Sequence, residues 1–280
     1  MAEKLSREDL EKQARSYERL CDADLQGINL ENANLAGGHF IRCNFQNARM
    51  AKVNLECADL FGSNFNGADL RGAKLREAAL EEADLTTANL SNAILVEARL
   101  TRAILDKTVL VQADLRTASL NEVHAVLADF TGANLNRATS RAGSFVLCLM
   151  DNCQAAGFIA VKANFSGASL KGTIMDRAVL IGANFSLANL EEASLRGCPL
   201  KQANFFGAEL RGVKFTKSNL EGAHFLHANA EQAMMNGVNL RGANLSEANF
   251  NGTNFDNSFL LQSITVHTQF EGASFKEAKR

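Results

Sequence analysis

The stretch from Asn66 to Leu90, NGADLRGAKLREAALEEADLTTANL, repeats itself every five residues. Leucine recurs at every fifth position, and alanine stands two residues before each of these leucines. An α-helix would repeat its apolar face about every 3.6 residues and a β-strand about every 2. A period of five fits neither element. It indicates a repeated unit made of a short extended piece followed by a tight turn.

The same register extends along most of the chain. From Leu25 to Phe275, 41 of the 51 positions numbered in multiples of five hold Leu or Phe, and Ala holds 31 of the 51 positions two residues earlier. Eighteen of the twenty glycines lie two residues after the Leu/Phe position. A glycine confined to one slot indicates a positive φ there, as in a type II turn. We therefore expect the large and small residues to point inward and the other three to face solvent.

This A(D/N)LxG pattern resembles that of the pentapeptide-repeat family. The resemblance implies an all-β fold, a right-handed quadrilateral parallel β-helix with four five-residue sides per coil. That architecture implies about 13 coils here, spaced about 4.8 Å apart. Residues twenty apart should then stack, so that Asp176 and Arg196 pair across one coil. One predicted inward column consists of Phe145, Phe165, Phe185, Phe205 and Phe225.

The repeat also suggests how the chain is organised. We expect an N-terminal capping helix within residues 1–21, the β-helix over 22–275 and a short C-terminal tail at 276–280. The helix is predicted from Arg7 to Leu20, because Ser6 is a good N-cap residue and acidic residues follow in the first turn.

An irregular coil is expected at about 138–162. Inward positions in this segment hold Ser140, Ala155 and Ala160 in place of Leu or Phe, which leaves the axis underfilled. The register resumes at Phe165, so any insertion must be a multiple of five residues long. The segment is either a five-residue loop or an intact but bulged coil.

Two groups of outward apolar residues are candidate contact sites. An exposed apolar patch can mark an interaction site, although scattered apolar residues are common on protein surfaces. The first group lies on two neighbouring predicted coils. The second group lies in the last predicted coils, where it suggests either self-association into a homodimer or a terminal coil that frays. The first group, called the apolar patch below, is Ile159, Val161, Val179 and Ile181, and the second, called the C-terminal group, is Phe259, Leu261, Ile264 and Val266.

Other kinds of site find little support in the sequence. The chain has 29 Lys plus Arg against 31 Asp plus Glu, so direct nucleic-acid binding is not expected. We expect no secretion signal or membrane span, and hence a cytoplasmic protein. The six cysteines lack zinc-ligand spacing, and the five histidines do not form a metal site. Cys43, Cys148, Cys153 and Cys198 occupy the small inward slot.

The leading functional hypothesis is a non-enzymatic solenoid that presents flat, rigid faces to a protein partner. It needs no catalytic residues, cofactor or small-molecule substrate. The family resemblance implies an alternative, a DNA-mimicking modulator of a type II topoisomerase such as gyrase that confers drug or toxin resistance. Such mimics are strongly acidic, because they must present a phosphate-like density of charge. A further alternative is a bacterial secreted effector without a cleavable signal, or an accessory protein of a secretion apparatus.

Overall fold

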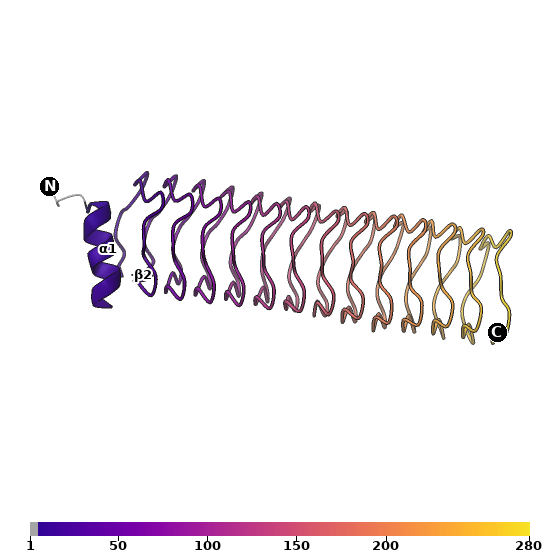
Figure 1. The fold of residues 1–280 in the computed structure, drawn as a ribbon. Coiled ribbons are helices and arrows are strands. Elements are labelled where there is room, and N and C mark those ends of the chain that lie inside the picture. The colour runs from indigo at the N-terminus through magenta and orange to yellow at the C-terminus, as the bar shows by residue number, and fades with distance from the viewer. Residues whose placement is uncertain (1–4) are drawn as a thin grey trace. The chain divides into compact units, whose positions relative to one another are not determined.

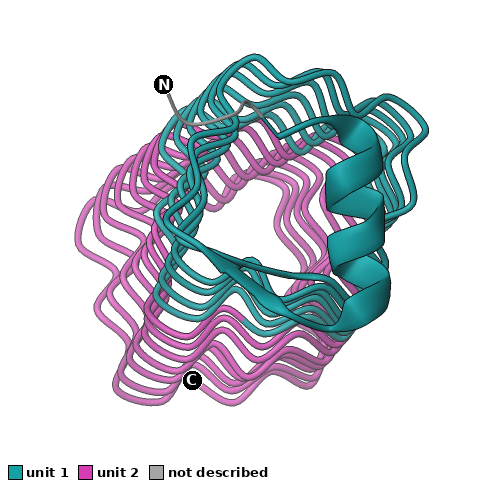
Figure 2. Cartoon of the chain, turned by 90° about the vertical axis from the view of Figure 1, so that its left-hand side faces the viewer, with its two compact units in different colours: residues 1–139 teal, residues 140–280 magenta. Residues whose placement is uncertain are grey.

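The computed structural model describes residues 5–280, so the part of the predicted capping segment at residues 1–4 lies outside the described residues. The chain divides into two compact units, unit 1 (1–139) and unit 2 (140–280), coloured separately in Figure 2. Unit 1 contains α1 (Arg7–Ser16) and the short strands β1 (Arg19–Cys21) and β2 (His39–Ile41) (Figure 1). β1 and β2 pair in parallel.

Parallel β-bridges between residues twenty apart build both units. In unit 1 they extend from the pair Asp24–Asn44 to the pair Ser119–Thr139, and in unit 2 the pair Ser144–Asn164 begins a similar series. Each bridge is made by two hydrogen bonds, as where Leu70 N donates to Asn89 O at 2.8 Å and Asn89 N donates to Ala68 O at 2.9 Å. Each unit is therefore a parallel β-helix that advances one coil every twenty residues.

A tight turn closes every pentapeptide. In the repeat at Leu70, the N–H of Ala73 donates to Leu70 O at 3.0 Å, and Gly72 between them has a φ of +63°. All eighteen glycines of this slot have positive φ, as the sequence predicted. Many ordinary residues share this conformation, for example Lys107 and Leu187. Stacking of the coils therefore imposes the left-handed backbone on whichever residue occupies the slot.

Inward Leu and Phe side chains fill the axis of each unit. The predicted phenylalanine column is confirmed in unit 2, where neighbouring rings from Phe145 to Phe225 stack at centroid distances of 5.0, 4.9, 5.2 and 4.9 Å. Twelve phenylalanines are among the largest fully buried side chains. Burying one such side chain contributes about 1.5–3 kcal/mol before the conformational entropy is subtracted. The filled axis is the hydrophobic core of both units.

α1 ends four residues earlier than predicted, at Ser16 rather than Leu20. Tyr17 takes a left-handed conformation with a φ of 56° and stops the helix. The next residues pair with the following coil as β1, and this pairing overrides their helical propensity. The side chains of Leu10 and Ala14 in α1 are buried, whereas Tyr17 is 71% exposed. Leu10 and Ala14 are therefore the side chains of α1 that pack against the coil.

α1 caps the first coil with hydrogen bonds as well as apolar contacts. Figure 2 shows it lying across the end of unit 1. Glu11 Oε1 accepts from the N–H of Asn34 at 3.1 Å, and the Arg7 guanidinium donates to the carbonyl oxygens of Glu31 and Asn32 at 3.1 and 3.2 Å. These bonds supply partners for backbone groups that a preceding coil would otherwise satisfy. The helix is anchored by Ser6 and Asp9, which form a capping box.

Residues 140–162 keep the repeat without a loop or bulge, so neither predicted irregularity is present in this described stretch. Ser140 N donates to Ile159 O at 2.7 Å, as the regular coil requires. Phe158 fills the space left by the small inward residues, since its buried ring meets that of Phe145 edge-on at 6.4 Å. The predicted tail is also part of the coil, because Lys279 bridges to Phe259.

Candidate interaction surfaces

The apolar patch lies on two neighbouring coils of unit 2. Ile159 bridges to Val179, and Lys162 N donates to the carbonyl oxygen of Ile181 at 2.9 Å. Ile181 is exposed, and Ile159, Val161 and Val179 are half-buried. The structure thus brings together the four residues that the period of twenty placed side by side.

Unit 2 also has exposed leucines that the sequence analysis did not single out. Leu147 and Leu187 are 51% and 63% exposed. Each lies against the glycine of the following coil, because a Cβ at Gly167 would be 2.7 Å from Leu147 Cδ2 and one at Gly207 would be 2.9 Å from Leu187 Cδ2. The alternation of Leu and Gly at intervals of twenty is the sequence signal that could have found this pairing.

The C-terminal group faces outward, as predicted. Its four residues are all exposed. Phe259 and Leu261 line a shallow groove with Asn239 and Arg241, and Lys279 Nζ lies 5.2 Å from the centre of the Phe259 ring. A lysine over an aromatic face is a weakly favourable cation–π contact. The group therefore combines an apolar surface with a basic rim.

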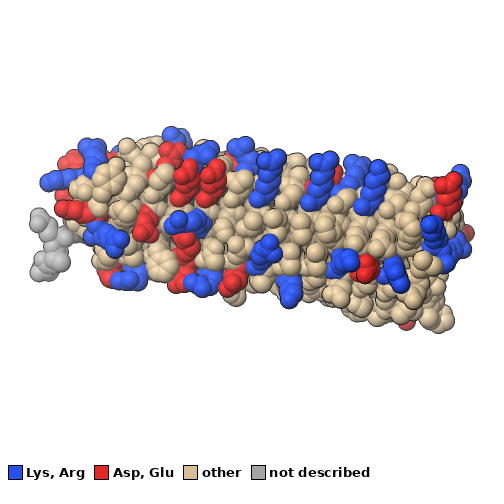
Figure 3. Space-filling model, turned by 90° about the horizontal axis from the view of Figure 1, so that it is seen from below, with Lys and Arg blue, Asp and Glu red and all other residues tan. Residues whose placement is uncertain are grey.

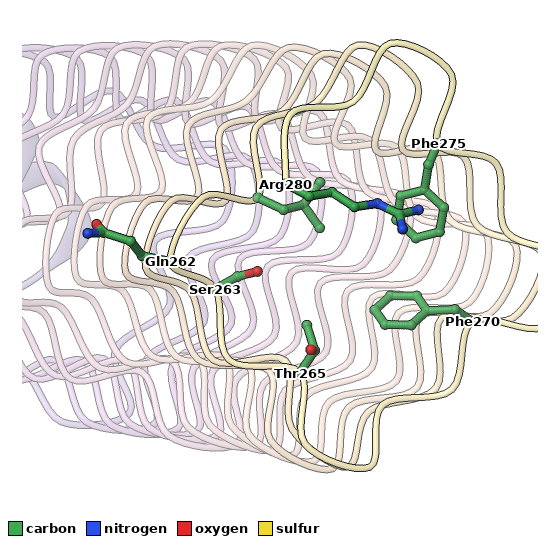
Figure 4. A pocket seen from close by; sticks show the side chains of 7 residues that line it. Gln262, Ser263, Thr265, Phe270, Phe275 and Arg280 are labelled. Carbon is green, nitrogen blue, oxygen red and sulfur yellow. The ribbon is translucent and has the colours of Figure 1, made fainter.

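A pocket of about 360 Å³ opens in the last coils of unit 2 (Figure 4). Thr265 occupies one of the multiple-of-five positions usually held by Leu or Phe, and it lines this pocket together with Phe270 and Phe275. The guanidinium of Arg280 lies 3.9 Å from the centre of the Phe275 ring. The pocket has an aromatic wall, and the one charged side chain in its lining is this stacked arginine.

The four inward cysteines, Cys43, Cys148, Cys153 and Cys198, are buried. Burial raises the pKa of the Cys43 thiol to about 11 and that of Cys198 to about 12. Cys21 and Cys57, in contrast, are exposed. Thiols with such raised pKa values are poor nucleophiles at neutral pH, so packing accounts for Cys43 and Cys198.

The histidines do not form a metal centre in the described part of the chain. No group of three or more His, Cys, Asp or Glu among residues 5–280 is arranged to hold a metal ion. His227 instead lies 3.3 Å from a carboxylate oxygen of Glu247 and meets the Phe206 ring edge-on. Within the same residues, α1 is too short to cross a membrane.

Comparison with known families identifies the repeat. The model of the family described as pentapeptide repeats matches eight segments, at residues 23–60, 54–92, 83–121, 108–139, 148–186, 161–197, 183–222 and 223–262. The chain is a pentapeptide-repeat protein. Membership supports the right-handed β-helix that the resemblance implied, here with one short N-terminal helix.

Solved structures of other pentapeptide-repeat proteins are also similar to this chain. HetL of the cyanobacterium Nostoc sp. strain PCC 7120, described as involved in heterocyst differentiation regulation, is 28% identical over 97% of both chains with a TM-score of 0.24. QnrB1, a plasmid-mediated fluoroquinolone resistance protein, is 17% identical over 66% of this chain and 88% of its own, with a TM-score of 0.46. Curated protein sequences give no match.

Proposed function

We propose that this pentapeptide-repeat protein is a non-enzymatic scaffold that binds a protein partner through the apolar patch of unit 2. The observation that carries the proposal is the stacking of Ile159 on Val179, which holds apolar side chains on a hydrogen-bonded backbone. A rigid surface of this kind binds with little loss of conformational entropy. We also propose that each coil has four sides and that the protein is cytoplasmic, as expected from the sequence.

The surroundings of the patch favour one kind of partner. Lys162 is exposed, lies next to Val161 in the chain and makes no ion pair in the described residues. Lys201 follows one coil after Ile181, and its charge is balanced by Glu221 at 2.9 Å. A partner segment with apolar side chains and a nearby carboxylate would match the apolar patch and Lys162. The proposed partner is therefore a protein with an acidic, apolar segment.

A catalytic role has less support from the geometry. Catalytic groups usually converge in a concavity. The inward slots hold mainly Leu, Phe, Met and Ala, and most buried hydroxyls bond to backbone carbonyls, as Thr173 does to Met150 O at 2.6 Å. The polar atoms in the core are thus satisfied by the coil itself.

The charge pattern does not favour the topoisomerase alternative. On the side seen in Figure 3, basic side chains are interspersed with acidic ones, and no continuous acidic surface is seen. Many acidic residues are also neutralised, as Glu81 is by Arg99 at 2.7 Å. A mimic of duplex DNA would need a continuous acidic surface.

A differential capture experiment tests the proposed interaction. Ile181→Glu places a charge on the exposed member of the apolar patch, and Leu187→Glu places the same charge on an exposed leucine outside it. We expect the wild type and Leu187→Glu to retain the same cellular protein and Ile181→Glu to lose it. Equal recovery by all three, or recovery by none, would rule out the patch as the binding surface.

A further inference from the structure

A second surface of unit 2 forms a small basic recess. Its lining residues are Asp176, Arg177, Arg196, Gly197, Thr216 and Lys217, and its volume is about 350 Å³. We call it the basic recess.

Coil stacking brings these residues together from three successive coils. Arg177 N donates to Arg196 O at 2.8 Å, and Gly197 N donates to Thr216 O at 3.0 Å. Arg177, Gly197 and Lys217 therefore occupy equivalent turn positions on consecutive coils, and all three have positive φ. With a coil spacing of about 4.8 Å, the Cα atoms of Arg177 and Lys217 lie about 10 Å apart.

Gly197 creates the hollow between the two outer cations. An added Cβ at this residue would meet only Arg177 Cγ, at 3.9 Å. The space is therefore open to a side chain or to a ligand. Because Arg196 precedes Gly197 in the chain, its side chain belongs to the middle coil of the basic recess.

The three cations have no protein partner. Arg177, Arg196 and Lys217 are exposed, and their side chains make no ion pair or hydrogen bond with the described residues. Other cations of unit 2 are paired, for example Lys201 with Glu221 at 2.9 Å. The basic recess thus holds a local excess of positive charge.

Asp176 does not neutralise this charge by an ion pair. The predicted pairing of Asp176 with the Arg196 side chain is wrong. Asp176 Oδ1 instead accepts from the Ser194 hydroxyl at 2.5 Å and from the backbone N–H of Arg196 at 3.1 Å. The carboxylate is held by local donors, which leaves the guanidinium of Arg196 available to a ligand.

We propose that the basic recess binds a phosphate group through Arg177, Arg196 and Lys217. A phosphate monoester carries close to two negative charges at neutral pH, and its oxygens accept hydrogen bonds from guanidinium and ammonium groups at once. Three unpaired cations facing one carboxylate match this charge. The group is either free phosphate or the phosphate of a phosphorylated protein. This inference does not depend on the proposed partner of the apolar patch.

Isothermal titration calorimetry at constant ionic strength tests the basic recess by measuring the affinity for two probes. The probes are inorganic phosphate and a phosphoserine peptide of otherwise uncharged sequence. We expect Arg196→Gln to weaken binding by about tenfold or more, as expected for a lost hydrogen bond to a charged group. Lys107→Gln in unit 1 is the matched control, because it removes an exposed cation that makes no ion pair with the described residues and lies outside the basic recess. The affinity of this variant for both probes should stay within about twofold of the wild type.

Gly197→Asn separates a built site from simple charge attraction. It keeps all three cations but fills the hollow, and asparagine already takes the same left-handed conformation at Asn152 and Asn257. We expect this variant to lose phosphate binding as well. Tighter binding of the peptide than of free phosphate would identify a phosphorylated protein as the source, and equal binding would identify free phosphate. Binding equal in the wild type and both recess variants, or no binding of either probe by the wild type, would overturn the proposal.

Discussion

Asn184 and Asn204 form one rung of an amide ladder on the outside of unit 2. Asn204 Nδ2 donates to Asn184 Oδ1 at 3.1 Å, and the same oxygen accepts from the backbone N–H of Ser186 at 3.1 Å. Asn184 Nδ2 in turn donates to Asn164 Oδ1 at 3.0 Å. Each asparagine thus secures its own turn and links neighbouring coils, which accounts for the asparagine before many inward Leu or Phe residues.

The ladder should contribute measurably to stability. Asn184→Ala removes three hydrogen bonds in a half-buried position, and we expect it to lower the free energy of unfolding by about 1–2 kcal/mol. Urea unfolding followed by circular dichroism measures the change. Gln154→Ala is the control, because Gln154 lies in an equivalent bridge position and its side chain makes no hydrogen bond with any of residues 5–280. Equal losses for the two variants would contradict a role for the ladder.

Substitutions in the phenylalanine column should destabilise the fold more than substitutions in the amide ladder. Phe185 stacks between Phe165 at 4.9 Å and Phe205 at 5.2 Å. Phe185→Ala should cost about 3–5 kcal/mol, because it opens a cavity in a packed axis. Phe185→Leu should cost much less, since leucine fills the same slot elsewhere, as at Leu190. Similar urea midpoints for both variants would show that the axis is not tightly packed.

Alkaline pH should destabilise the coil around Cys198. Burial raises the pKa of this thiol from 9.0 to about 12. The folded state therefore holds the proton more tightly than the unfolded state, so this contribution is complete below pH 9 and declines above it. We expect the wild type to lose more stability than Cys198→Ala between pH 8 and 11. Parallel pH profiles of the urea midpoint would contradict this linkage.

The N-terminal helix α1 should stabilise the first coils of unit 1 and not the coils of unit 2. Leu10 is a fully buried residue of α1. Leu10→Ala should weaken the packing of the helix on the coil by about 2–5 kcal/mol. Hydrogen exchange should then accelerate at residues of the first coils, such as Asn34, whose N–H bonds to Glu11. Exchange in unit 2 should not change. Leu5→Ala, at a residue that is 37% exposed, is the control and should leave exchange unaltered.

Much of this fold can be predicted from the sequence, because each repeat position has one environment. The inward slots, the phenylalanine column and the outward direction of Ile181 and Val266 all follow from the periods of five and twenty. The end of α1 does not, since residues after Ser16 have helical propensity and only their pairing as β1 overrides it. Phe158 stands in a slot that usually holds a small residue, so the sequence also indicates that its ring fills the underfilled axis, where it meets Phe145.

The candidate surfaces were harder to predict. The apolar patch could be read from adjacent columns, but the basic recess requires three facts at once. Two cations forty residues apart must share a column, Gly197 must leave the space between them open, and Asp176 must be bonded elsewhere. The sequence suggested instead that Asp176 and Arg196 form a pair, because spacing shows which residues are neighbours and not which atoms bond.

The most direct test of the coil is a cross-link between residues twenty apart. Ser166 Oγ and Ser186 Oγ lie 3.0 Å apart on neighbouring coils. With Cys21 and Cys57 replaced by serine, the double variant Ser166→Cys/Ser186→Cys should oxidise to a disulfide without loss of structure. The control pair Ser166→Cys/Ser246→Cys, four coils apart, should remain reduced in the monomer. Ready cross-linking of the control pair, or none of the neighbouring pair, would contradict a β-helix with twenty residues per coil.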